Sequence, residues 1–226
     1  MAGESAGVNG AQPHITVRHL TMAYGSFVVM RDLNFTVSRG DVFIIMGGSG
    51  SGKSTLLRHL VGLNEPAAGE IFYGEENFTK ADPEQRQRML RRMGVLFQSG
   101  ALWSSMTLAE NVSLPLEEYT DLSPAEIREV ASLKLALVGL KGFEDYYPSQ
   151  ISGGMQKRAG LARAMALDPE ILFFDEPSSD RMLEIENRVE PPVEVVGNVR
   201  DLFEQTVGRV RHDSPLAPPV MSTVNS

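Results

Sequence analysis

The sequence contains no cysteine among its 226 residues, so disulfide bonds, thiol nucleophiles and thiolate metal ligands are all excluded. This composition favours the reducing cytosol. Long apolar runs are also missing: the strongest one near the motifs below, residues 42–46, is far shorter than the ~20 residues of a membrane-spanning helix. We therefore expect any role at a membrane to depend on a partner protein.

Basic residues are in the minority, with 21 Lys and Arg against 29 Asp and Glu and a formal net charge of -8. The electrostatic footprint of a nucleic-acid-binding protein is absent, so we expect no nucleic-acid partner. The 42% hydrophobic content is enough for a sizeable core in one large domain. Residues 1–12 are rich in Gly, Ala and Ser, and they predict a disordered leader and not a signal peptide.

Hydrophobic patterning predicts an α/β fold. Apolar and polar residues alternate over residues 14–37, which predicts an antiparallel strand region with one solvated face. Residues 41–46 predict a fully buried strand, and leucines at helical spacing predict a helix over 53–61. Further strands are expected at 69–73, 93–97 and 171–174, and further helices at 82–92, 123–137 and 155–166. This order indicates a mainly parallel sheet, an N-terminal antiparallel β region and a helical lobe over about residues 99–167.

A glycine-rich loop separates the predicted buried strand from the helix that follows it. Its residues are Gly47, Gly48, Ser49, Gly50, Ser51, Gly52, Lys53, Ser54 and Thr55. Glycines let backbone N–H groups approach a polyphosphate because no side chain stands in the way. Lys53 is expected to reach the β- and γ-phosphates of ATP and Ser54 to ligate Mg²⁺. The alternative is a flexible loop that contains a lysine by chance, but the strand–loop–helix context favours the phosphate site.

Two acidic residues, Asp175 and Glu176, come directly after the predicted strand 171–174. A carboxylate at this position can hold Mg²⁺, and the next one can polarise an attacking water. We therefore predict Asp175 as a metal ligand and Glu176 as a catalytic base. The alternative is a strand that simply ends in a polar turn.

A third motif, Ser152-Gly153-Gly154, precedes the helix predicted over 155–166. It places a hydroxyl and bare backbone N–H groups at a helix start, where an anion can bind. With the glycine-rich loop and Asp175 in this order, the segment resembles the signature of ABC-transporter ATPases. The resemblance implies a P-loop NTPase fold of the RecA-like type, with ATP and Mg²⁺ as cofactors. It also implies a homodimer, in which the signature of one subunit closes over the γ-phosphate held by the second.

The resemblance implies roles for further residues. Tyr24 resembles the aromatic residue that stacks on adenine; the alternative is a core tyrosine at a strand end. Gln98 resembles the glutamine that senses Mg²⁺ and water and links to the membrane partner, which makes it a catalytic candidate together with Lys53 and Glu176. The alternative for Gln98 is a solvated strand terminus. Trp103, the only tryptophan, is interpreted either as lobe packing or as part of a docking surface.

The resemblance can be narrowed to one branch of the family. Residues 98–103, 105–107 and 110–112, together with Met155 in place of the usual glutamine, resemble the Mla/Mce branch. The likeness covers residues 14–179. It implies that the protein helps to move phospholipid or related hydrophobic cargo through a membrane permease, with a lipid-binding envelope protein of the Mce type as a further partner. The implied location is cytoplasmic, peripheral at the inner membrane.

The pattern of the family fails after Ser179. Members of the family continue into a Leu-Asp turn and then a β-branched strand that ends in Thr-His, and neither is evident in this sequence. His212 faintly resembles the switch histidine but is interpreted as a surface residue. Either residues 193–196 replace the missing central strand or the sheet has a gap, and the gap is the expectation.

The expected organisation follows from these motifs. Residues 13–179 form the nucleotide-binding domain, 180–213 an atypical helical tail, and 214–226 a disordered end. The loss of a donor aimed at transition-state charge costs ~10²–10³ in rate. The alternative function is therefore a truncated or altered homologue that binds nucleotide but hydrolyses it poorly or not at all. Outside the motifs, the histidines lack metal-ligand spacing and are expected on strand or helix surfaces; they are His14, His19 and His59.

Overall fold

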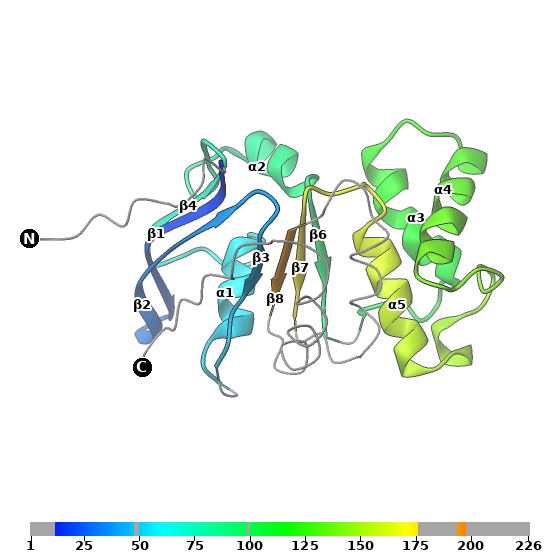
Figure 1. The fold of residues 1–226 in the computed structure, drawn as a ribbon, viewed down its shortest axis with the longest axis horizontal. Coiled ribbons are helices and arrows are strands. Elements are labelled where there is room, and N and C mark those ends of the chain that lie inside the picture. Colours follow the sequence, from blue (N-terminus) through cyan, green and yellow to red (C-terminus); the bar gives the residue numbers. More distant parts are fainter. Residues whose placement is uncertain (1–11, 48–49, 99, 176–193, 198–226) are drawn as a thin grey trace, which may run out of the picture.

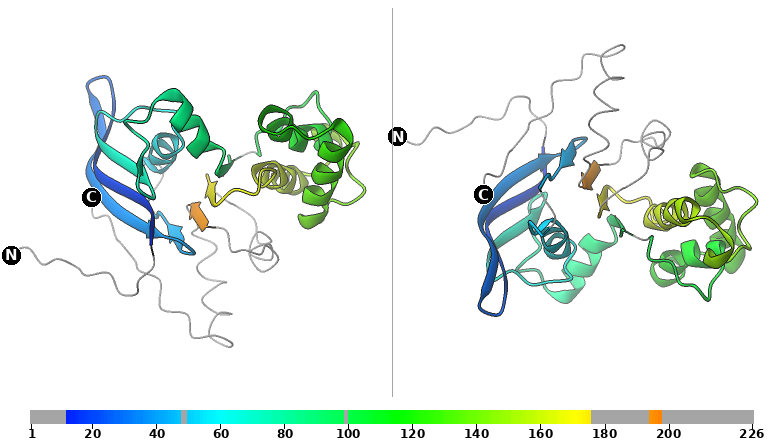
Figure 2. Two further views of the ribbon diagram at one scale, coloured as in Figure 1. Left: turned by 90° about the horizontal axis from the view of Figure 1, so that it is seen from above. Right: turned by 90° about the horizontal axis from the view of Figure 1, so that it is seen from below.

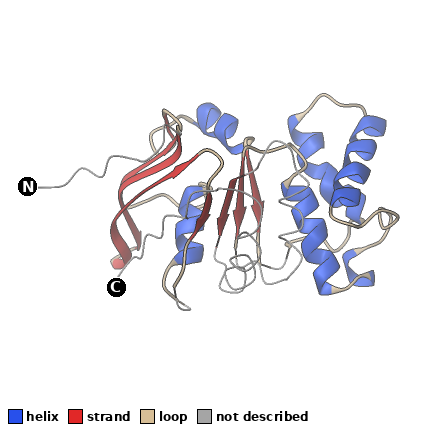
Figure 3. Ribbon diagram, viewed as in Figure 1, coloured by secondary structure: helices blue, strands red, loops and turns tan. Residues whose placement is uncertain are grey.

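The computed structural model describes residues 12–47, 50–98, 100–175 and 194–197. Figure 1 shows an antiparallel sheet on one side, a second sheet in the middle and a group of helices on the other side. Coloured by secondary structure, the strands occupy one end and the middle of the molecule, and the opposite end is helical (Figure 3). Among the described helices, none has the length and apolar character needed to cross a bilayer.

The first sheet is antiparallel, as the alternating sequence pattern predicts. Its strands are β1 (Pro13–Tyr24), β2 (Phe27–Ser38), β4 (Ala68–Tyr73) and β5 (Glu76–Asn77), in the order β2-β1-β4-β5. Gly25 lies in the turn between β1 and β2 with φ 57°, a left-handed conformation that glycine adopts without steric cost. The prediction of an antiparallel region over 14–37 is confirmed.

The second sheet is parallel and carries the candidate site. Its strands are β3 (Val42–Ile44), β6 (Met93–Leu96), β7 (Ile171–Phe174) and β8 (Glu194–Gly197), in the order β3-β8-β7-β6. The predicted strands 93–97 and 171–174 are confirmed. β3 is shorter than expected, and the prediction of a fully buried strand over 41–46 is wrong because Val42 is 50% and Met46 55% exposed. β3 pairs with β8 alone and is the edge strand of the described sheet.

Strand β8 corrects the expectation for the C-terminal part of the core. It lies between β3 and β7 and pairs in parallel with both, with Val195 opposite Val42 on one side and Leu172 on the other. The expected gap in the sheet is therefore wrong, and the alternative, in which residues 193–196 replace the missing strand, agrees with β8. This strand stands inside the segment expected to be a helical tail. The physical reason is that a strand between two neighbours is hydrogen-bonded on both sides. This pairing stabilises even a short strand, and it cannot be predicted from the sequence of the strand itself. His212 and the other predictions for residues 198–226 lie outside the described residues.

Capping residues define the helices. These are α1 (Lys53–Leu60), α2 (Pro83–Leu90), α3 (Leu108–Tyr119), α4 (Pro124–Leu137) and α5 (Gly153–Ala164), with a 3₁₀ turn at Pro148–Gln150. Reciprocal capping boxes open α2, α3 and α4, and the box of α4 at Ser123 is the one that the sequence predicts. Helices α3, α4 and α5 form the helical lobe beyond β6, which the two further views show from above and below (Figure 2).

Two hydrophobic cores meet at strand β7. Ile171 and Phe173 belong to a core with the antiparallel sheet and α1, whereas Leu172 and Phe174 belong to a core with the helical lobe. Successive side chains of a strand point to opposite faces, so four consecutive apolar residues serve both cores. All four side chains are buried. Strand β7 therefore ends in a rigid setting, and Asp175 directly follows it.

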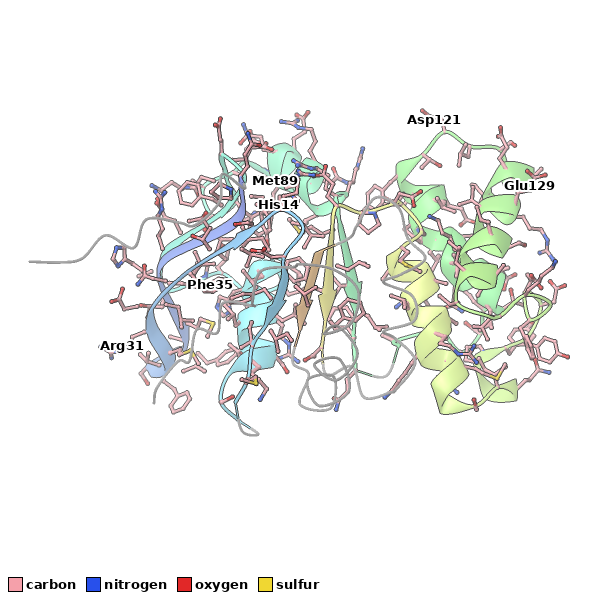
Figure 4. The ribbon with its side chains drawn as sticks, in the orientation of Figure 1. His14, Arg31, Phe35, Met89, Asp121 and Glu129 are labelled. Carbon is pink, nitrogen blue, oxygen red and sulfur yellow. The ribbon has the colours of Figure 1, made fainter. Side chains whose placement is uncertain are left out.

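Two histidines are buried, contrary to the expectation of surface positions. His14 is 3% and His59 1% exposed, so the prediction is wrong for both, whereas His19 is exposed as expected. The Nδ1 atom of His59 lies 2.7 Å from the carbonyl oxygen of Thr55 in the preceding helical turn, which pairs one of its two ring nitrogens. His14 lies on β1 near the top of the molecule in Figure 4, with its Nε2 atom 3.3 Å from Glu170.

Glu170 joins the two sheets at the amino end of β7. Its carboxylate accepts two hydrogen bonds from Arg92, at 2.8 Å from Nε and 2.9 Å from Nη2, and one at 2.9 Å from Arg39. The bonds from Arg92, aided by the one from Arg39, lower the pKa of Glu170 to about 2. Arg39 follows β2 of the antiparallel sheet, and Arg92 precedes β6 of the parallel sheet. The cluster therefore ties the sheets together at the end opposite Asp175.

Candidate nucleotide-binding site

The glycine-rich loop folds around the amino group of Lys53. Gly50 and Gly52 have φ of 80° and 88°, in the left-handed region that only glycine adopts readily. A Cβ atom at Gly52 would also lie 2.9 Å from Cγ1 of Val29, so a side chain there is crowded as well as strained. Lys53 Nζ donates to the carbonyl oxygen of Gly47 at 2.6 Å and to Ser51 Oγ at 3.2 Å. The cation is thus held at the loop.

Helix α1 differs from the longer helices in how it begins. Helices α2, α3, α4 and α5 all have a side chain that accepts from a first-turn N–H group, whereas α1 has none and begins after Gly52. Its first turn also has no acidic residue. The N-cap residue of α1 therefore offers no side chain to the first N–H groups, which lie at the positive end of the helix dipole. This arrangement fits an anionic ligand such as a phosphate.

Ser54 and Asp175 meet across the carboxyl edge of the parallel sheet. Ser54 Oγ donates to Asp175 Oδ1 at 2.8 Å, and both residues are partly buried. A hydroxyl oxygen and a carboxylate oxygen side by side are hard donors of the type that Mg²⁺ prefers. The structure thus brings together two of the predicted metal ligands. Glu176, Gly48 and Ser49 lie outside the described residues.

Tyr24 lies at the end of β1, next to the glycine-rich loop. Its ring is 49% exposed, so the alternative of a buried core tyrosine is wrong. Its hydroxyl accepts a hydrogen bond from Asn64 at 3.1 Å, and a hydrogen bond with the Thr55 side chain is the main cause that lowers the Tyr24 pKa. Thr55 belongs to the loop motif, so the hydroxyl group of Tyr24 connects its ring to the candidate nucleotide site. Sequence reasoning missed Asn64, which carries no motif.

Gln98 and the signature motif lie on the helical side of the site. Gln98 is exposed and lies just beyond β6, with Phe97 between them. Ser152 caps α5 by accepting from the N–H of Met155 at 3.3 Å, and a Cβ atom at Gly153 or Gly154 would meet nothing within 4 Å. Figure 1 shows the start of α5 at the same end of the molecule as the start of α1, with the parallel sheet between them. The signature is therefore open to a ligand, and the sheet separates it from the loop of its own chain.

These features define a P-loop nucleotide-binding domain: a glycine-rich loop between a parallel strand and a helix without an N-cap side chain, with a carboxylate after another strand of the same sheet. The chain belongs to the ABC transporter family, because the family model described as "ABC transporter" matches residues 30–179. The fold agrees with this assignment. The chain is similar to the ATP-binding cassette MJ0796 in a dimeric structure bound to ADP and Pi, with a TM-score of 0.76, 29% identity and coverage of 84% of this chain and 89% of that one.

Curated relatives match about three quarters of the chain. The protein is 44% identical over 165 residues to the probable ribonucleotide transport ATP-binding protein mkl of Mycobacterium tuberculosis, over 73% of this chain and 46% of that one. It is 40% identical over 163 residues to the intermembrane phospholipid transport system ATP-binding protein MlaF of Escherichia coli K12, over 72% of this chain and 61% of that one. The matched part thus spans about half to three-fifths of the length of these relatives.

Proposed function

We propose that this chain is the ATP-binding subunit of an ABC transporter, which couples the binding and hydrolysis of ATP to a membrane permease. The observation that carries the proposal is the contact between Ser54 and Asp175 beside the uncapped start of α1. Lys53 and the loop N–H groups hold the phosphates, and Ser54, Asp175 and Gln98 hold Mg²⁺, which neutralises charge on the phosphates. Glu176 acts as the general base, and Tyr24 stacks on adenine.

The active unit is a homodimer. The start of α5, with its serine hydroxyl and open glycine N–H groups, is shaped for an anion but lies across the sheet from the loop of its own chain. A second copy can place this signature over the γ-phosphate. The dimeric arrangement of the similar cassette MJ0796 supports the same assembly here.

The cargo is phospholipid or a related hydrophobic molecule. Support comes from residues 98–103 and from Met155, which resemble the Mla/Mce branch, and from the relatives named MlaF at 40–42% identity. The relatives named mkl carry a ribonucleotide in their name, so ribonucleotide is the competing cargo. In the proposed assembly, the chain lies at the cytoplasmic side of the inner membrane through its permease, with an Mce-type envelope protein as a further partner.

Nucleotide binding by the purified full chain tests the first part of the proposal. We expect saturable binding of a fluorescent ATP analogue that strengthens with Mg²⁺ and is lost in Lys53→Ala. The matched control is Lys141→Ala, which removes an exposed lysine of the helical lobe and leaves binding unchanged. Equal affinity of Lys53→Ala and the unaltered protein would overturn the proposed site. Phosphate release above that of Lys53→Ala separates an ATPase from the alternative homologue that only binds nucleotide.

Reconstitution tests the cargo. The chain is purified with its permease in liposomes, and hydrolysis is measured while either phospholipid or a ribonucleotide is supplied as cargo. We expect phospholipid to stimulate hydrolysis and a ribonucleotide to leave it unchanged. Stimulation by the ribonucleotide alone would reject the lipid assignment and leave the nucleotide site intact.

A further inference from the structure

The backbone that follows Gln98 is fastened to the last turn of helix α5. Gly100 N–H donates to the carbonyl oxygen of Phe97 at 2.8 Å, which closes the chain around Gln98. The two outer nitrogens of Arg163 then bind this backbone: Nη1 donates to Ala101 O and Nη2 to Gly100 O, each at 2.9 Å. A planar guanidinium fork that holds two successive carbonyl groups fixes both position and orientation.

Two glycines, Gly100 and Gly160, allow the backbone of this segment to approach the backbone of α5 closely. A Cβ atom at Gly160 of α5 would lie 2.7 Å from Gly100 Cα and 2.8 Å from Gly100 O. A Cβ atom at Gly100 would lie 2.8 Å from the carbonyl oxygen of Gln156, also on α5. Neither distance is compatible with a side chain, so the backbone of Gly100 packs directly on the backbone of α5. The contact is rigid because backbone atoms, unlike side-chain ends, have little freedom to move.

A second anchor holds the next residues of the same segment. Asn111 of α3 is fully buried, accepts from the Trp103 N–H at 2.7 Å and donates to the Trp103 carbonyl oxygen at 3.1 Å. Its amide also donates to the carbonyl oxygens of Met106 and Thr107. Residues 100–103 are therefore bound to two helices of the lobe. Trp103 itself is 62% exposed, so the alternative of lobe packing does not describe its ring.

Helix α5 carries this attachment to the signature motif. Arg163 lies in its last turn, and Ser152 is its N-cap. An α-helix of 12 residues has one continuous hydrogen-bonded backbone, so α5 is a rigid element that can carry coupling between its two ends. Gln98, at one end of this path, faces the nucleotide of its own chain in the proposed function, and Ser152 faces that of a second copy.

We propose that Arg163 is a positioning residue that links Gln98 to the Ser152–Gly154 end of α5. When Gln98 shifts on nucleotide binding, the segment 100–103 and α5 shift with it as one body, and the signature is presented to the second copy. This inference rests on the proposed function, because it needs ATP at the glycine-rich loop. It adds a residue of α5 that contacts neither nucleotide and acts through the backbone next to Gln98.

The chain offers a matched control on the same helix. Arg158 also donates from Nη1 to two carbonyl oxygens, those of Val138 at 2.9 Å and Gly139 at 3.2 Å. These carbonyl groups follow α4, within the lobe and away from Gln98. Replacement of Arg158 or Arg163 by methionine removes a comparable set of bonds and retains an apolar stem. A merely structural role predicts similar effects for both variants.

Trp103 provides the readout, because it is the only tryptophan and lies in the attached segment. Nucleotide affinity, Trp103 emission and self-association by sedimentation are measured for the full chain with Mg²⁺ and a slowly hydrolysed ATP analogue. We expect the unaltered protein and Arg158→Met to respond alike in all three measurements. Arg163→Met keeps the nucleotide affinity, loses the change in Trp103 emission and associates about tenfold more weakly, as expected for the loss of a coupling between sites. Arg163→Lys restores part of the response, because one amino group can reach a single carbonyl.

Three results would overturn the inference. They are an unaltered emission response in Arg163→Met, an equal loss in Arg158→Met, and no emission change in the unaltered protein at saturating nucleotide. Urea unfolding of both variants shows that they are folded before the comparison is made. Lys53→Ala separates this inference from the proposed function: nucleotide affinity that survives this substitution rejects the site itself, whatever Arg163 does.

Discussion

Ser54 and Asp175 are 121 residues apart in the sequence, yet the hydroxyl of Ser54 donates to the carboxylate of Asp175 at 2.8 Å. The contact joins the start of α1 to the end of β7. Each residue has a fixed backbone, because α1 packs in one core and β7 is shared by two. The two oxygens are therefore held together before any ligand arrives, which reduces the cost of ordering them.

Asp175→Asn tests this pair. The substitution keeps the shape and an oxygen acceptor for Ser54 but removes the charge. We expect the affinity for ATP with Mg²⁺ to fall about tenfold or more, equivalent to ~1.4 kcal/mol, while the affinity without Mg²⁺ stays the same or rises. Calorimetric titration with and without the metal measures both, and Asp145→Asn on the lobe surface is the control. An equal loss with and without Mg²⁺ would contradict the metal-binding role.

Replacement of Tyr24 tests the adenine contact. Because stacking of a base on an aromatic ring contributes ~1–3 kcal/mol, we expect Tyr24→Ala to weaken ATP binding about tenfold and Tyr24→Phe to retain it. Inorganic triphosphate, which has no base, should bind equally well to all three proteins. Competition against a fluorescent ATP analogue measures these affinities. If Tyr24→Ala loses triphosphate and ATP to the same degree, the ring supports the loop and does not stack on the base.

The Glu170 cluster makes a prediction about acid stability. Its pKa is lowered to about 2 from an ordinary value of 4.5, so the stabilisation is complete above pH 4.5 and is lost as the pH falls towards 2. The side chain is 34% exposed, and solvent screening reduces the contribution to about 1–2 kcal/mol. We expect Glu170→Gln to lower the free energy of unfolding by this amount at pH 7. The difference from the unaltered protein should disappear near pH 2, as followed by urea unfolding.

Glu117→Gln is the control for that experiment, because Glu117 is exposed on α3. It should leave both the stability and its pH dependence unchanged. A difference between Glu170→Gln and the unaltered protein that persists at full size near pH 2 would show that lost packing, and not charge, is responsible.

Strand β8 can be tested through its backbone. Val195 lies opposite both Val42 and Leu172 in the parallel sheet, so a proline at this position removes a central N–H donor and leaves a partner unpaired. We expect Val195→Pro to lower the free energy of unfolding by about 1–3 kcal/mol. Val195→Ala keeps the N–H group and separates the side-chain contribution. Equal stability of Val195→Pro and Val195→Ala would place this residue outside the sheet.

Much of the site follows from local sequence. The loop from Gly47 to Thr55 has strict spacing, and the strand 171–174 has four consecutive apolar residues, so both are predicted with their context. The capping box at Ser123 likewise depends only on residues three positions apart. In each of these cases, the physical requirement lies within a few neighbouring residues.

Apart from His59, the features that sequence reasoning missed depend on distant partners. His14 is buried beside Glu170, and no local pattern connects residues so far apart. His59 does carry a signal, because it lies among the buried leucines of α1 at helical spacing. The sequence offers residues 193–196 as a strand only as the alternative to a gap, because four residues are too few for periodicity to distinguish a strand. The place of β8 is set by its neighbours β3 and β7. Arg163 has no motif of its own, and its role emerges only from the carbonyl groups that it contacts.

The order of strands has a consequence for how the protein is made. β3 and β6 leave the ribosome long before residues 194–197, and β7 leaves it shortly before them, yet those four residues lie between β3 and β7. During synthesis, the nascent chain must hold β3 and β7 apart or in a provisional pairing until its last described strand emerges. Such late, non-local closure slows folding and exposes two strand edges to chaperones and to other copies. The biogenesis of this protein is therefore expected to be most vulnerable in the interval between the emergence of β7 and that of β8.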